Sequence, residues 1–207
     1  MRARKVSSGQ TLALLLALTL TALCDISTSA GVEPSREGAR SAKQKVAEIA
    51  QFADRPVAQP RRTTVTEHEV NSYLMFEAGD QIPAGVVDPS VTIVGDGRVS
   101  ARAVVDLDAV RKQGNPRSLF DPINYLSGRV PVTATGILRA NNGVGHVEFE
   151  SAAIGPVPVP KIVLQEIVGY YSRTADNPSG IGLDDSFKLP ARIREIQVQS
   201  GRAVVVQ

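Results

Sequence analysis

Residues 91–107, VTIVGDGRVSARAVVDL, predict the fold of this chain more clearly than any other stretch. Their second half alternates apolar with polar side chains, which is typical of a strand with one buried face. The apolar positions there are Val99, Ala101, Ala103, Val105 and Leu107. Val91 and Ile93 precede Gly95-Asp96-Gly97, which has the composition of a tight turn. We therefore expect a β-hairpin over residues 91–107.

Two further hairpins follow along the chain. The second covers residues 130–154 and turns at Asn141-Asn142-Gly143, residues that tolerate positive φ. One face of its first strand carries Val132, Ala134, Gly136 and Leu138. The third covers residues 194–206 and turns at Ser200-Gly201. Turns this short join antiparallel neighbours, so we expect six strands in three antiparallel hairpins.

Helical patterns occupy the rest of the chain. An apolar stripe over residues 43–53 predicts a short helix, and prolines 56 and 60 stop it. Thr66 and Glu69 have the spacing of a capping box, which predicts a second helix from Thr66 to about Gly79. A third helix is expected over residues 161–172, after the alternating prolines of residues 155–160. The predicted fold class is α+β, a curved antiparallel sheet of about six strands packed on two or three helices.

The third helix has a wider apolar face than packing on one sheet requires. It carries Ile162, Val163, Leu164, Ile167, Val168, Tyr170 and Tyr171. A helix that packs on a single sheet needs only one apolar stripe. We therefore expect part of this face to contact something besides the sheet.

Residues 1–30 have the pattern of a secretory signal peptide. Arg2, Arg4 and Lys5 precede the apolar run 11–23, and small or polar residues follow. The apolar run falls short of the roughly 20 residues that span a bilayer. Cleavage after Ala30 or near Cys24 both fit, and lipidation of Cys24 or an uncleaved anchor are the alternatives. Each alternative sends the chain to the periplasm or outside a bacterial cell.

The amino-acid composition divides residues 31–207 into a lead-in and a domain. Residues 31–62 are small and polar apart from the short helix, and end in a Pro/Arg-rich stretch, so we expect a flexible lead-in and linker. Residues 63–207 are expected to form a single α+β domain. The chain has 23 basic and 21 acidic residues, of which residues 1–30 hold three and one, leaving 20 of each. This neutral balance does not support nucleic-acid binding.

The sequence contains no recognisable catalytic constellation. His68 and His146 are the sole histidines, neither lies in a metal-binding pattern, and we expect both at the surface. The pairs Asp106/Asp108 (expected on one face of a strand) and Asp184/Asp185 (in a loop) have the chemistry for a cation site or acid–base catalysis. Paired surface carboxylates are far commoner than catalytic ones, so we predict no catalytic residues, no metal, no cofactor and no enzymatic activity.

The order of elements resembles a family of lipid carriers. The capped helix TEHEVNSYL (residues 66–74), the three hairpins and the closing LPARIREIQVQSGRAVVV (residues 189–206) resemble the LmeA-like periplasmic phospholipid-binding proteins. That family is similar to one half of a tubular lipid-binding (TULIP) domain. The resemblance covers roughly residues 65–207, and implies a curved sheet wrapped around a helix with acyl chains in the gap.

The residues themselves point to the same kind of site. The inward strand positions Ala101, Ala103, Ala134 and Gly136 are small and leave room either for a close-packed helix or for a groove. The predicted lipid-binding residues are Val99, Ala101, Ala103, Val105, Val132, Ala134 and Leu138 on the sheet, with Ile162, Ile167 and Tyr171 on the helix. The expected function is non-enzymatic binding or shuttling of phospholipid or a similar envelope lipid.

This hypothesis implies lipid acyl chains as partners and transient contact with a membrane surface. The alternative is an envelope structural or interaction module. In that case the helix over residues 161–171 docks a partner protein or a second copy of the chain.

Overall fold

The structure is a computed structural model that describes residues 33–54, 59–83, 85–113, 127–171, 178–180 and 182–207. The predicted signal peptide, including Cys24, lies outside the described residues. Residues 33–207 form one compact unit. Within the described part of the chain, no helix is both long enough and apolar enough to cross a bilayer.

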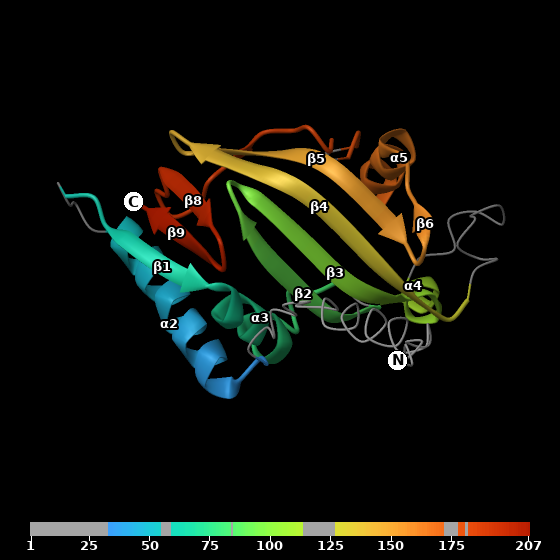
Figure 1. The fold of residues 1–207 in the computed structure, drawn as a ribbon, viewed down its shortest axis with the longest axis horizontal. Helices are drawn as coiled ribbons and strands as arrows, with labels where there is room; N and C mark the ends of the chain where they lie inside the picture. Colours follow the sequence, from blue (N-terminus) through green and yellow to red (C-terminus); the bar gives the residue numbers. More distant parts are fainter. Residues whose placement is uncertain (1–32, 55–58, 84, 114–126, 172–177, 181) are drawn as a thin grey trace, which may run out of the picture. The chain divides into compact units, whose positions relative to one another are not determined.

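All the strands belong to one antiparallel sheet (Figure 1). They are β1 (Arg62–Thr66), β2 (Val86–Gly95), β3 (Arg98–Asp106), β4 (Arg129–Asn141), β5 (Val144–Ile154), β6 (Val157–Pro158), β7 (Phe187–Lys188), β8 (Glu195–Gln199) and β9 (Arg202–Val206). The order is β1-β9-β8-β4-β3-β2, with β5 paired to β4, β6 and β7. The predicted hairpins are β2–β3, β4–β5 and β8–β9, and the α+β class is confirmed. The short strands β1, β6 and β7 were not predicted.

The helices are α2 (Arg36–Ala53), α3 (Glu67–Phe76), α4 (Leu107–Gln113) and α5 (Lys161–Tyr171). The expected lead-in is wrong for residues 36–42, which form the first turns of α2 because the Ser35 side chain accepts from the Gly38 amide. Leu107 was expected in a strand but begins α4, since Asp106 Oδ1 accepts from the Ala109 amide at 3.0 Å. The capping box of Thr66 and Glu69 on α3 is confirmed.

Two hairpin turns depend on residues with positive φ. Asp96 and Gly97 have φ of 52° and 85°, and Asn142 and Gly143 have 53° and 79°. Two consecutive left-handed residues twist a two-residue loop in the sense of the strands it joins. The dipeptides Asp-Gly and Asn-Gly therefore set where β2–β3 and β4–β5 turn.

Helices α2 and α3 pack through small residues. A Cβ at Gly38 would lie 2.6 Å from Ser72 Oγ and 2.7 Å from His68 Nε2, so glycine permits the approach. Ser72 is fully buried and its hydroxyl accepts from the Ser35 amide at 3.0 Å. His68, expected to be solvated, is half-buried with Nε2 3.0 Å from Ser35 Oγ. The interface thus covers much of a histidine that the sequence placed at the surface.

A buried carboxylate also joins these two helices. Glu69 of α3 is 8% exposed, and its Oε2 accepts from Lys45 Nζ and from the Thr66 amide, each at 2.8 Å. Ser41 Oγ donates to Oε1 at 2.5 Å. Burial acts to raise the pKa of Glu69, but the bonds from Lys45, Ser41 and Thr66 outweigh it and lower the pKa to about 2. The carboxylate is therefore ionised across the physiological range.

Candidate functional site: an apolar groove on the sheet

Strands β2, β3, β4 and β5 bring small and apolar side chains into register on one face. Ala101 pairs with Val91 on β2 and with Ala134 on β4, and Ala134 pairs in turn with Ala152 on β5. The next row on the same face joins Ala103, Val132 and Ile154. Side chains alternate between the faces of a strand, so these residues share one surface. The result is a floor made largely of methyl groups.

Behind the groove, the opposite face of these strands is largely polar. One row joins Thr92, Ser100, Thr135 and Ser151, and Thr135 Oγ1 donates to Ser100 Oγ at 3.1 Å. One polar and one apolar face is usual for an antiparallel sheet that meets solvent on one side. The groove therefore lies on the face that the sequence alternation marked as inward.

A groove of about 470 Å³ lies on the apolar face, and nearly all of its exposed lining is apolar. Its size falls within the range of small-molecule sites. The lining residues are Leu74, Pro89, Ser90, Val91, Ala101, Arg102, Ala103, Val132, Thr133, Ala134, Ala152, Ala153, Ile154, Val159 and Leu164. Ser90, Arg102, Thr133 and Ala153 share the row between the two floor rows, so strand alternation directs their side chains to the other face.

The walls of the groove come from α3 and from the segment that leads into α5. Leu74 projects from α3, while Val159 and Leu164 flank the start of α5. Helix α3 is held at the edge of β2 by Asn71, whose side chain bonds both backbone groups of Val91, and by Glu67 Oε2, which accepts from the Ile93 amide at 2.6 Å. These bonds satisfy edge amides of β2 and set the position of Leu74.

The structure brings together four of the predicted lipid-binding residues. Ala101, Ala103, Val132 and Ala134 line the groove. Val99 and Val105 extend the same face beyond the two floor rows, and Leu138 lies farther along β4, where its amide donates to Gly97 O at 2.8 Å. These three do not line the groove.

The one predicted lipid-binding residue on helix α5 whose side chain the structure describes is not found in the groove lining. Ile162 is 73% exposed and does not line the groove, whereas Leu164, two residues later, does. The two positions are separated by about half a helical turn, and only the packing of α5 on β5 selects between them. The side chains of Ile167 and Tyr171 lie outside the described residues.

Gly136 was one of the small positions expected to leave room for a close-packed helix or for a groove, but strand β5 closes that space instead. A Cβ there would lie 2.9 Å from Glu148 O and 3.0 Å from Val147 Cγ1, so the position is filled by β5 itself. A β-bulge between Thr135 and Gly136 shifts the β4–β5 register by one residue. The bulge is also the reason that Ala152 and Ile154 were missed, because counting from the Asn142-Gly143 turn misaligns them.

The two acidic pairs have structural partners. Asp106 was expected on a strand face with Asp108, but it caps α4, and Asp108 Oδ2 accepts from the Gly128 amide at 3.0 Å. The pKa of Asp106 is lowered, mainly by the bond from the Ala109 amide. Asp184 pairs with Lys161 at 2.7 Å, and Asp185 accepts from the Gly182 amide at 2.6 Å. Among the described residues, no group of three His, Cys, Asp or Glu side chains is placed to hold a metal ion.

Comparison with known proteins does not assign this chain to a family. No protein-family model matches the chain, no curated protein matches it, and no solved structure matches its fold.

Proposed function

We propose that this protein is an exported, non-enzymatic carrier that holds the acyl chains of a phospholipid or similar envelope lipid in the groove. The observation that carries the proposal is the groove itself, with its floor of in-register alanines and its almost wholly apolar lining. An apolar concavity with few polar groups suits a ligand recognised by its hydrocarbon part. The resemblance to the LmeA-like family supports the same assignment.

The energetics of lipid exchange fit a protein without catalytic machinery. Each methylene that moves from water into the groove contributes about 0.8 kcal/mol of free energy. Moving the same methylene from water into a bilayer contributes a similar amount. Transfer from a membrane to an apolar groove is therefore close to thermoneutral. No energy source is needed at the site, and the proposed carrier acts by exchange.

The decisive experiment tests whether lipid co-purifies with the protein. Native mass spectrometry and solvent extraction of the purified protein are expected to release lipid in stoichiometric amount, and lipid-free protein is expected to take it up from vesicles. Ala134→Leu places a larger side chain on the floor and should reduce uptake, whereas Thr92→Leu on the opposite face should not. Absence of bound lipid together with absence of uptake overturns the proposal.

A second candidate function is docking of an envelope protein or a second copy through residues 161–171. The exposure of Ile162 at 73% and Val163 at 46% favours a contact at this place. Docking of a second copy predicts oligomers in solution that dissociate with Ile162→Asp. Docking of another protein predicts a specific complex, isolated from the envelope, that the same substitution abolishes.

A further inference from the structure

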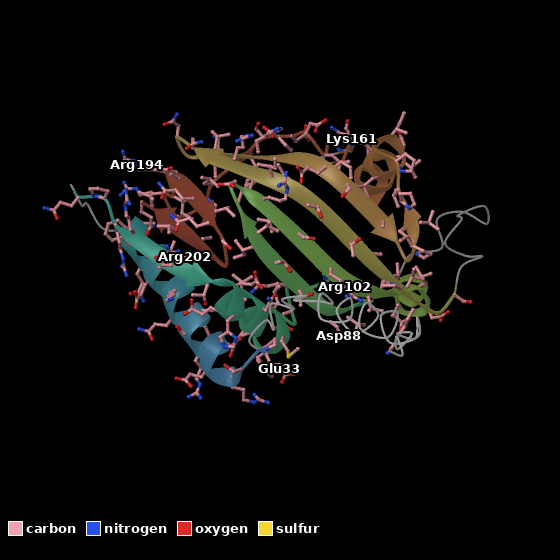
Figure 2. All side chains as sticks on the ribbon, in the orientation of Figure 1. Glu33, Asp88, Arg102, Lys161, Arg194 and Arg202 are labelled. Carbon is pink, nitrogen blue, oxygen red and sulfur yellow. The ribbon has the colours of Figure 1, made fainter. Side chains whose placement is uncertain are left out.

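A run of exposed apolar side chains borders the groove where β6 leads into α5. Ile154 is 42% exposed, Val157 61%, Ile162 73% and Val163 46%. We call residues 154–163 (IGPVPVPKIV) the rim segment. In Figure 2 Lys161 marks its position at the start of α5, well away from Arg194 and Arg202 beside the β8–β9 hairpin.

The rim segment joins the outer surface to the inside of the groove. Ile154 is both exposed and part of the groove lining. Val159, in the middle of the segment, and Leu164, directly after it, line the groove as well. The exposed apolar surface is therefore continuous with the surface on which a hydrocarbon chain would lie.

The backbone of the rim segment is suited to a medium without water. Its three prolines carry no N–H group. Gly155 donates to Pro131 O at 2.7 Å, Val159 to Ala152 O at 2.9 Å and Val163 to Pro160 O at 3.0 Å. A backbone donor without a partner is costly in hydrocarbon, so internal bonding and prolines together reduce the cost of leaving water.

Charge at the rim is small and compensated. Lys161 is the one ionisable residue of the segment, and its Nζ bonds Asp184 Oδ1 at 2.7 Å. At a membrane surface, a lysine here would keep its ammonium in the headgroup layer while its stem lies along apolar surface. Attraction to the membrane would therefore come from the apolar side chains rather than from net charge, and would not require anionic lipid.

We infer that the rim segment inserts into the outer part of a lipid bilayer and places the mouth of the groove against the lipid it exchanges. The inference rests on the proposed lipid-carrier function and identifies the surface through which the cargo passes. A lipid that moves along this continuous apolar path does not expose its chains to water.

The chain contains no Trp, which permits a local test of insertion. Ile162→Trp places one indole on the rim, and Val46→Trp places one on α2 at a position that is 51% exposed. With neutral phosphatidylcholine vesicles carrying brominated acyl chains, we expect a blue shift and quenching of the indole at position 162. The indole at position 46 should show neither change, and added salt should not reverse the effect at 162.

The inference would be overturned by no quenching at position 162, by equal quenching at position 46, or by loss of the effect in high salt. A blue shift at position 162 that depends on protein concentration without vesicles would also overturn it, because that result assigns the rim to a second copy.

A second variant separates this inference from the carrier function. Val157→Ser with Ile162→Ser removes two exposed side chains that do not line the groove. It should slow lipid transfer from vesicles by about tenfold or more, yet leave binding of a monomeric short-chain phospholipid unchanged. If the short-chain lipid binds and transfer stays at the parental rate, insertion of the rim is overturned and the carrier function stands. If the parental protein binds no short-chain lipid although position 162 is quenched, the carrier function fails and membrane insertion stands.

Discussion

The side-chain amide of Asn71 bonds both backbone groups of Val91. The Val91 amide donates to Asn71 Oδ1 at 2.7 Å, and Asn71 Nδ2 donates to Val91 O at 2.8 Å. The side chain thus takes the place that a neighbouring strand would occupy at the edge of β2. Leu74 lies three residues farther along α3, on the same side of the helix, and lines the groove.

Asn71→Ala should therefore destabilise the protein by about 1–3 kcal/mol, because two part-buried backbone groups lose their partner. The free energy of unfolding in urea measures the change. Gln81→Ala is the matched control, since Gln81 Nε2 donates to Tyr73 OH at an exposed site. We expect the control to change stability by less than about 0.5 kcal/mol. Equal effects of the two substitutions would contradict the role given to Asn71.

Glu69 should make the stability of the fold depend on acid pH. Its pKa is about 2 in the folded chain and 4.5 when unperturbed, so the unfolded chain binds more protons between these values. The stabilisation is complete above about pH 5 and disappears as the pH falls toward 2. Its size is on the order of 3 kcal/mol, at 1.36 kcal/mol for each pKa unit.

Glu69→Gln should accordingly be less stable than the parental protein at pH 7, with the difference closing as the pH falls toward 2. Urea titrations at pH 7, 4 and 2 measure this difference. Glu37→Gln, in the first turn of α2 and outside the Glu69 network, serves as the control. If the difference in free energy of unfolding between Glu69→Gln and the parental protein stays constant across that range, the partners of Glu69 do not lower its pKa.

Gly38→Ala should destabilise the packing of α2 on α3. The added methyl would meet Ser72 Oγ and His68 Nε2 at under 3 Å, and overpacking of this kind costs about 1–3 kcal/mol. Helix propensity alone acts in the opposite direction by up to about 1 kcal/mol. Gly79→Ala is the control, because a Cβ there has no neighbour within 4 Å. A stabilised Gly38→Ala protein in thermal unfolding would rule out the close contact.

Asp106 should act as a cap rather than as a catalytic acid. Asp106→Ala removes the acceptor of the Ala109 amide and should speed hydrogen exchange at that amide, while Asp106→Asn keeps an acceptor and should exchange more slowly than Asp106→Ala. Lipid uptake should be unchanged in both variants, because Asp106 does not line the groove. Identical exchange at Ala109 in the alanine variant and the parental chain would contradict the capping role.

Local patterns determined much of this fold. Alternation along residues 99–105, the Asp96-Gly97 and Asn142-Gly143 turns and the Thr66/Glu69 capping box all depend on neighbours within a few residues, and the structure has each of them. Strands β6 and β7 were missed because two residues cannot show alternation, and β1 (RTTVT) because it has one apolar side chain and no hairpin turn beside it. Residues 36–42 were missed as helix because their small side chains pack on α3 and show no apolar stripe.

On β3 and β4 the sequence by itself determined which residues face inward, because alternation is a property of the backbone. It therefore identified Ala101, Ala103, Val132 and Ala134, which line the groove. Only the tertiary structure decided where the groove begins and ends. The bulge at Thr135 and Gly136 resets the register of β5, and long-range packing turns Leu164 rather than Ile162 toward the sheet. Both outcomes depend on contacts between residues far apart in the chain, which no local pattern encodes.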